Sequence, residues 1–128
     1  MEIVDEIRGL VKRALRKGEA EAEIEETLFE DVYIESDEDW ETLLHEDIPA
    51  ELRNLLKQAG LACNVYHKKD DVPGFEYVAN CITKDGRPVA LGFDIYYDYE
   101  FGKVTLLSAE AWANVRWSPS QLVYYHEV

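Results

Sequence analysis

Basic residues are missing from one long stretch of this sequence, residues 19–47. The stretch contains no Lys or Arg but holds 14 of the 27 acidic residues, and the other 13 acidic residues are balanced by the 13 basic ones. The net charge of −14 therefore arises in this stretch, which we call the acidic segment. Such a segment indicates either a solvated face that maintains solubility or a docking surface for a basic partner.

Long hydrophobic runs are also missing. No apolar run approaches the roughly 18 residues that would suggest a membrane span, and the first residues lack the basic start and apolar core of a signal peptide. The sequence therefore predicts a cytoplasmic protein that binds no membrane. Its pI near 4.5 also predicts no direct contact with nucleic acid, because the phosphates would be repelled.

Motifs for metal and nucleotide chemistry are absent as well. Cys63 and Cys81 form no CxxC pair, and we predict that both are reduced and packed in strands. The three histidines, His45, His67 and His126, occur in no HxxxH or HExxH motif, and no glycine lies in a phosphate-binding motif. We therefore predict no metal, no cofactor and no enzymatic activity.

The first half of the chain is typical of helices. Apolar residues recur at spacings of three and four over residues 2–17, and Gly18 is suited to end that helix. Residues 19–29 alternate Glu with Ala as a strand would, but the segment's length and its Ala and Glu content favour a helix. Residues 28–34 fit either a helix or a short edge strand.

Two further helices are expected before the midpoint. Ser36 precedes three acidic residues, which predicts an N-cap and a short helix that turns Leu43 and Leu44 inward. Pro49 is suited to the first turn of another helix that Gly60 ends.

After Gly60 the apolar pattern changes to the period of two that strands show. Strands are expected over 61–68, 75–84 and 87–97, with a turn at 73–74 and a two-residue hairpin turn at Asp85-Gly86. That turn pairs Val78 with Phe93 and places both on the core side of the sheet. The opposite side, over 75–81 and 90–96, could be core, pocket or interface.

The remaining elements are also strands. Residues 104–107 should follow a tight turn at 100–103, and residues 122–126 should form the last strand. Residues 108–116 fit a helix or a strand, and we favour the strand.

Together these elements predict an α+β fold, in which N-terminal helices pack on one face of a mainly antiparallel C-terminal sheet of four to five strands. The chain length suits a single domain, residues 1–128, with a helical and acidic half (1–60) and a sheet half (61–128).

The acidic segment carries our functional hypothesis. Its charge is concentrated in one region, and aromatic residues within that region could anchor a partner, although the spacing of Trp40 with Leu43 and Leu44 also suits the core. We predict a small inhibitor of a nuclease or another nucleic-acid-binding enzyme, of the immunity-protein, antitoxin or phage anti-defence type, with a basic protein as its partner. The predicted partner-binding residues are Tyr33, Glu35, Asp37, Glu38, Asp39, Trp40 and Glu41.

The alternative is a pocket in the sheet half. The order of elements resembles that of the NTF2-like cone, a layout that implies a ligand or catalytic pocket between helices and sheet. Its expected lining is Tyr77, Asp94 and Tyr96, and a carboxylate among aromatic residues could act as a general acid or base. The best catalytic candidates lie in the cluster Asp94, Tyr96, Tyr97, Asp98, Tyr99 and Glu100.

Overall fold

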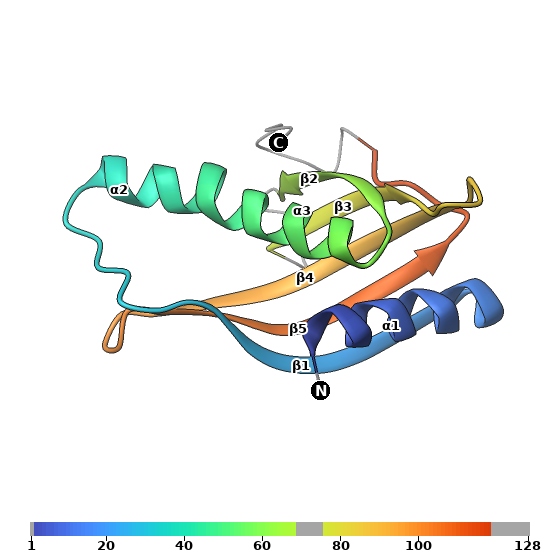
Figure 1. The fold of residues 1–128 in the computed structure, drawn as a ribbon. Coiled ribbons are helices and arrows are strands. Elements are labelled where there is room, and N and C mark those ends of the chain that lie inside the picture. The colour runs from blue at the N-terminus through green and yellow to red at the C-terminus, as the bar shows by residue number, and fades with distance from the viewer. Residues whose placement is uncertain (1, 69–75, 119–128) are drawn as a thin grey trace.

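The protein has an α+β fold with a five-stranded antiparallel sheet, as Figure 1 shows for the computed structural model, which describes residues 2–68 and 76–118. The strand order is β1-β5-β4-β3-β2. Within the described residues, no helix is both long enough and apolar enough to cross a membrane. The elements are α1 (Ile3–Lys17), β1 (Glu19–Phe29), α2 (Asp37–Thr42), a π-helical turn η1 (Leu43–Asp47), α3 (Ile48–Gln58), β2 (Ala62–His67), β3 (Tyr77–Ile82), β4 (Pro88–Asp98) and β5 (Lys103–Ala113).

The helix predicted over residues 2–17 is confirmed as α1. Its apolar stripe is buried, including Ile7, Leu10 and Ala14, and it packs beside β1 and β5. Gly18, with φ of 98°, ends the helix in a left-handed conformation that residues with a Cβ rarely adopt.

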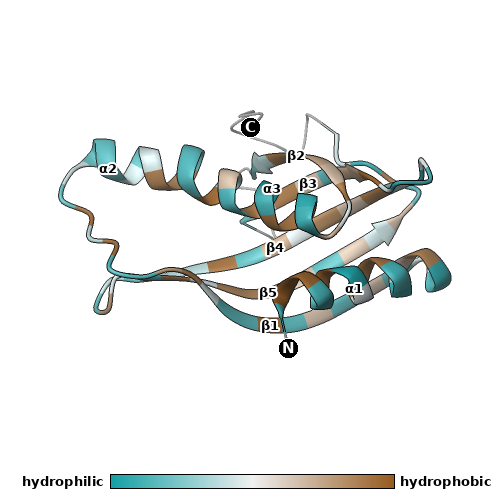
Figure 2. Ribbon diagram, viewed as in Figure 1, coloured by the Kyte–Doolittle hydropathy of each residue, from teal (hydrophilic) through white to brown (hydrophobic). Residues whose placement is uncertain are grey.

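The second helical region is one continuous helix from α2 through η1 to α3. The predicted N-cap at Ser36 is confirmed, since its hydroxyl accepts a hydrogen bond from the Asp39 N–H at 3.1 Å. Pro49 lies in the first turn of α3, also as predicted. The π-helical turn directly before it widens the helix where Pro49 lacks the N–H that regular α-helical bonding needs. In Figure 2, α2 is mainly hydrophilic, whereas brown apolar residues recur along α3.

The helix predicted over residues 19–29 is wrong, because this segment is β1. Its alternation places Ala20, Ala22 and Ile24 on the core side, where they pack against the hydrophobic core, and the intervening glutamates on the outer face. Pairing with β5 and packing against α1 outweigh the helix propensity of Ala and Glu. The sheet therefore includes a strand from the N-terminal half of the chain.

The predicted pairing of β3 with β4 is wrong by one residue. Gly86, with φ of 86°, belongs to a three-residue loop, and the Thr83 N–H bonds to the Arg87 carbonyl across it. Tyr77, not Val78, therefore lies opposite Phe93. A slip of one residue exchanges the two faces of a strand, so Tyr77, Ala79 and Cys81 join the core.

The C-terminal part of the sheet agrees more closely with the predictions from the sequence. The turn before β5 is confirmed, and the strand favoured over residues 108–116 is confirmed as far as Ala113, whereas residues 114–116 form no strand. Of residues 28–34, the first two end β1, and residues 30–34 form neither helix nor strand. The turn predicted at 73–74 and the strand predicted at 122–126 lie outside the described residues.

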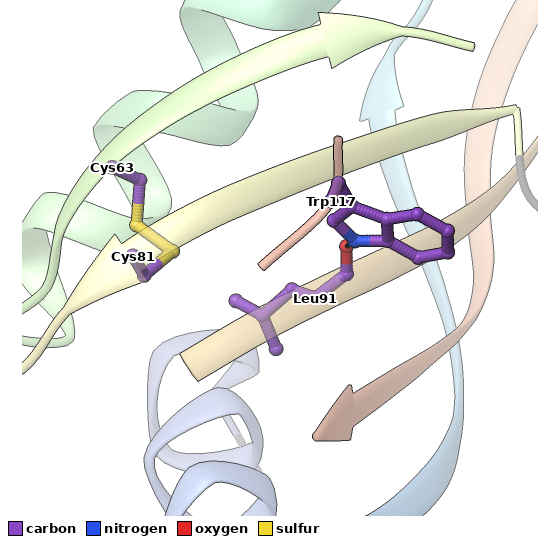
Figure 3. Close-up of a disulfide and its surroundings, with 4 residues drawn as sticks. All are labelled: Cys63, Cys81, Leu91 and Trp117. Carbon is purple, nitrogen blue, oxygen red and sulfur yellow. Dashed lines mark hydrogen bonds between the residues drawn. A yellow bond between two sulfur atoms is a disulfide. The ribbon is translucent and has the colours of Figure 1, made fainter. Parts of the chain in front are cut away.

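The expectation of two reduced cysteines is wrong, because Cys63 and Cys81 form a disulfide across the paired strands β2 and β3 (Figure 3). The two residues lie directly opposite each other, a relation that their spacing in sequence could not show. Disulfides are typical of proteins in oxidising compartments. The bond therefore does not support the predicted cytoplasmic location, which stays a prediction.

The outer face of the sheet is partly covered by the segment after β5. The indole N–H of Trp117 donates to the Leu91 carbonyl at 2.8 Å (Figure 3). The backbone of Trp117 exchanges two hydrogen bonds with the Asn80 amide, at 2.7 and 3.1 Å. Tyr66 and Val78 pack with Trp117 in a second, smaller apolar cluster.

Candidate functional site: an acidic and aromatic tip

The predicted partner-binding residues lie together at one end of the molecule. They occupy the connection from β1 to α2 and the first turns of α2, at the left of Figure 1, and the β4–β5 turn reaches the same end. We call this end the tip. Its residues are the predicted set, Tyr33, Glu35, Asp37, Glu38, Asp39, Trp40 and Glu41, together with Tyr99, Glu100 and Phe101 from the β4–β5 turn.

Hydrogen bonds hold the two chain segments of the tip together. The Val32 N–H donates to the Gly102 carbonyl at 2.8 Å. The Tyr97 hydroxyl donates to the Val32 carbonyl at 2.6 Å, so Tyr97 has a structural partner. Gly102 has φ of 62°, and a Cβ there would lie 2.8 Å from the Val32 carbonyl oxygen and about 3.0 Å from the Tyr33 ring. The close approach therefore depends on glycine.

We expect Gly102→Ala to loosen the tip. The positive φ and the close contact together should lower the free energy of unfolding by about 1–3 kcal/mol, measured by chemical denaturation. Gly86→Ala is the matched control, because Gly86 also has a positive φ but has no atom within 4 Å of a built Cβ. The Gly102 variant should lose more stability than the control and exchange the Val32 amide hydrogen faster. Equal losses would show that the contact with Val32 is unimportant.

The tip exposes large aromatic side chains. Tyr33, Tyr99 and Phe101 are 61%, 71% and 58% exposed. Trp40 is half-buried, packs against the hydrophobic core, and stacks on Tyr99 with ring centroids 6.1 Å apart. Trp40 therefore connects the exposed ring of Tyr99 to the protein interior.

Some carboxylates of the tip have structural roles, and others are exposed with none. The Asp39 carboxylate accepts a hydrogen bond from the Glu35 N–H at 3.1 Å, and the Glu41 carboxylate lies 3.2 Å from the His45 ring nitrogen. Glu35, Asp37 and Glu38 are exposed at the start of α2. Negative side chains there are stabilised by the helix dipole, which offsets part of their mutual repulsion.

The residues of the predicted catalytic cluster divide into two groups in the structure, with Asp94 and Tyr96 on the outer face of the sheet and the other four towards the tip. The Asp98 carboxylate accepts hydrogen bonds from the Glu100 and Phe101 N–H groups and thereby stabilises the β4–β5 turn. Asp94 lies on the outer face of the sheet and accepts a hydrogen bond from the Ser108 hydroxyl at 2.9 Å. Exposed Tyr96 shares that face.

Two of the three residues predicted for the alternative pocket, Asp94 and Tyr96, line one hollow of about 440 Å³ on the outer face, but Tyr77 does not. Tyr77 lies on the core side, opposite to Asp94 and Tyr96, and its hydroxyl donates to the Leu44 carbonyl at 2.7 Å. Burial raises the pKa of Tyr77, with a smaller contribution from Glu76. Because Tyr77 belongs to the core, the three predicted lining residues do not share a pocket.

A second group of acids lies on the outer face, away from the tip. Glu110 of β5 is directly opposite Glu21 of β1. Partial burial raises the pKa of Glu110, and the nearby charges of Glu21, Glu19 and Asp94 raise it further. Glu110 carries no signal in the sequence, because its acidic neighbours depend on the pairing of β1 with β5.

We expect Glu110→Gln to stabilise the protein at pH 7. Like charges directly opposite each other across strands cost about 0.2–1 kcal/mol, and the amide removes that repulsion. Because the folded-state pKa is raised, the folded protein takes up this proton at a higher pH than the unfolded chain. Acidification from pH 7 towards pH 5 should therefore increase the contribution of Glu110 to stability in the parent and have no such effect in the variant.

Thermal unfolding at several pH values measures this difference. Glu26→Gln is the control, since Glu26 is exposed and lies opposite Leu106 instead of an acid. A gain in stability of equal size in both variants would contradict a specific repulsion between Glu110 and Glu21.

The described histidines are not arranged as a metal site. The rings of His45 and His67 are 5.0 Å apart, and His67 stacks on Tyr77 at 4.9 Å. No group of three or more metal-ligating side chains occurs among residues 2–68 and 76–118. His126 lies outside the described residues.

Comparison of this chain with known protein families, curated proteins and solved structures finds no match. The tip itself is therefore the basis for inferring a function. Sequence reasoning placed seven of its residues but missed the contribution of Tyr99, Glu100 and Phe101 to the same surface. The sequence shows an aromatic residue on either side of Glu100 in a predicted turn, but not that this turn lies beside residues 32–41.

Proposed function

We propose that this protein is an inhibitory binding module whose tip occupies the basic, nucleic-acid-binding surface of an enzyme. Its class would be that of immunity proteins, antitoxins and phage anti-defence proteins. The observation that carries this proposal is the convergence of three exposed aromatic rings, Tyr33, Tyr99 and Phe101, with the exposed carboxylates at the start of α2.

The two kinds of side chain have separate roles in this proposal. Carboxylates attract a basic surface over several ångströms and accelerate association, which suits an inhibitor that competes with nucleic acid. Aromatic rings supply apolar area and fixed shape, and such residues dominate the binding energy of interfaces. The stacking of Tyr99 on Trp40 holds one ring in place before binding, which reduces the entropy lost on association.

Capture from the source cell tests this proposal. The immobilised protein should retain a basic enzyme at low salt and release much of it at moderate salt, because screening weakens the attraction between the charged surfaces. Addition of the protein to the retained enzyme should then inhibit its action on nucleic acid. Retention of acidic or neutral proteins only, or an enzyme whose activity is unchanged, would contradict the proposal.

A further inference from the structure

A basic groove lies away from the tip, beside the C-terminal end of α3. It has a volume of about 660 Å³ and runs between α3, the turn that follows it, and the β3–β4 turn. Arg53, Lys57 and Lys84 line it, and none of its described lining residues is Asp or Glu. In a chain with a net charge of −14, this concentration of positive charge is a distinct surface.

The fold brings these three cations together from two segments. Arg53 and Lys57 are four residues apart on α3, which places them on the same side of the helix. Lys84 comes from the three-residue β3–β4 loop, and its Cε lies 3.3 Å from where a Cβ of Gly60 would be. Since Gly60 has no side chain, the stem of Lys84 can pass close to the turn after α3.

The positive charge continues into an adjoining groove of about 420 Å³. That groove also includes Lys57 and Lys84 in its lining, and it adds Arg8 and Lys12 from α1. Arg8 is fixed by hydrogen bonds to Asp5 at 3.2 Å and to the Gln58 carbonyl at 2.8 Å. The Asp85 carboxylate, which also lines this groove, accepts a hydrogen bond from the Thr83 hydroxyl. Together the two grooves form an extended track with five cations.

The chemistry of the track favours a peptide over a phosphate group. Backbone N–H groups commonly cradle phosphate, but those of Gly60 and Leu61 already donate to α3 carbonyls at 3.0 Å. Apolar side chains also line the two grooves, including half-buried Leu15, exposed Ala62 and the edge of buried Leu61. Such a surface suits an extended ligand that alternates carboxylates with small apolar side chains.

We propose that this track binds an acidic peptide segment of a partner protein. The carboxylates of the peptide would pair with Arg53, Lys57 and Lys84, and its apolar side chains would lie over Ala62 and Leu15. This interaction is separate from that of the tip, which is negatively charged and lies elsewhere on the molecule. Either one can therefore fail without the other.

Binding of defined probes to the full chain tests the proposal. The probes are the fluorescein-labelled peptides Glu-Ala-Glu-Ala-Glu-Ile-Glu and Glu-Ser-Glu-Ser-Glu-Ser-Glu, measured by fluorescence anisotropy. The first should bind with a dissociation constant below about 1 mM and at least about fivefold more tightly than the second, because only the first has apolar side chains. Unlabelled tripolyphosphate should displace it less effectively than the unlabelled peptide does.

Variants locate the binding. Replacing Arg53, Lys57 and Lys84 together by Gln should weaken binding of the first peptide by about tenfold or more, and Lys84→Gln alone should weaken it less. The control variant replaces exposed Arg16, Lys17 and Lys103 by Gln, which removes the same charge away from both grooves and should leave binding nearly unchanged. Circular dichroism verifies that each variant is folded.

Three results would overturn the proposal. An equal loss of binding in the control variant would indicate a general attraction to positive charge. Displacement by tripolyphosphate at equal or lower concentration would identify a phosphate site. Absence of peptide binding below about 1 mM would show that the track is not a peptide site.

Discussion

Replacing Cys63 and Cys81 by alanine is expected to lower the free energy of unfolding by about 3 kcal/mol, because a disulfide restricts the unfolded chain. The two residues are separated by 18 positions, and the magnitude follows from the entropy of closing a loop of that length. Chemical denaturation measures the loss. Hydrogen exchange should increase most in β2, because this outer strand of the described sheet would lose its covalent link to β3.

The reducing agent provides the control for this prediction. Reductant should destabilise the parent protein to nearly the level of the double variant and should leave the double variant unchanged. A parent protein whose intact mass shows two free thiols under oxidising conditions would contradict the disulfide. Equal stability of the parent with and without reductant would contradict its energetic role.

Neutralising the tip is expected to slow association with the partner by roughly 10- to 100-fold at low salt, because charge complementarity mainly controls the association rate. The variant replaces Glu35, Glu38 and Glu41 by Gln and Asp37 by Asn. Asp39 is retained because its carboxylate bonds to the Glu35 N–H, whereas Glu41→Gln keeps a side-chain oxygen that can contact the His45 ring nitrogen. Surface plasmon resonance measures both rate constants. The dependence of the association rate on salt should also become weaker.

A second variant removes the same charge from another place. It replaces Glu19, Glu21, Glu23 and Glu26 by Gln, all of which are exposed on β1. Association of this control with the partner should be slowed much less. If the association rate constant falls by the same factor in both variants, the net charge of the protein, and not the tip, controls association. The partner site would lie on the outer face of the sheet if only the control is impaired.

Some parts of the fold could be predicted because local sequence decides them. The apolar stripe of residues 3–17, the hydroxyl of Ser36 and the glycine at 102 each specify a local structure that needs no distant partner. The helix, the N-cap and the tight turn were therefore all predicted from the sequence.

Other parts depend on contacts between distant segments. Residues 19–29 contain signals for both a helix and a strand, and only the pairing with β5 decides between them. The left-handed conformation of Gly86 adds one residue to a hairpin loop and thereby reverses the faces of β3. The disulfide needs that same register, so the separation of its cysteines in the sequence gave no indication of it.

The tip depends both on local sequence and on contacts between distant segments. Its acidic half is visible in the sequence as a run of charge around Trp40. Its other half comes from the β4–β5 turn, which the hydrogen bonds of Val32 bring to the same place. Tyr99 and Phe101 follow Val32 by more than 60 residues, so periodicity and composition could not assign them to this surface.

Competition with nucleic acid tests the central claim most directly. The measurement is the apparent dissociation constant of the captured enzyme for this protein at increasing concentrations of the nucleic acid that the enzyme binds, at constant ionic strength. If the tip occupies the nucleic-acid-binding surface, the apparent constant should rise in proportion to the nucleic acid once that ligand exceeds its own dissociation constant. A constant that does not change, with enzyme, nucleic acid and protein in one ternary complex, would contradict the claim.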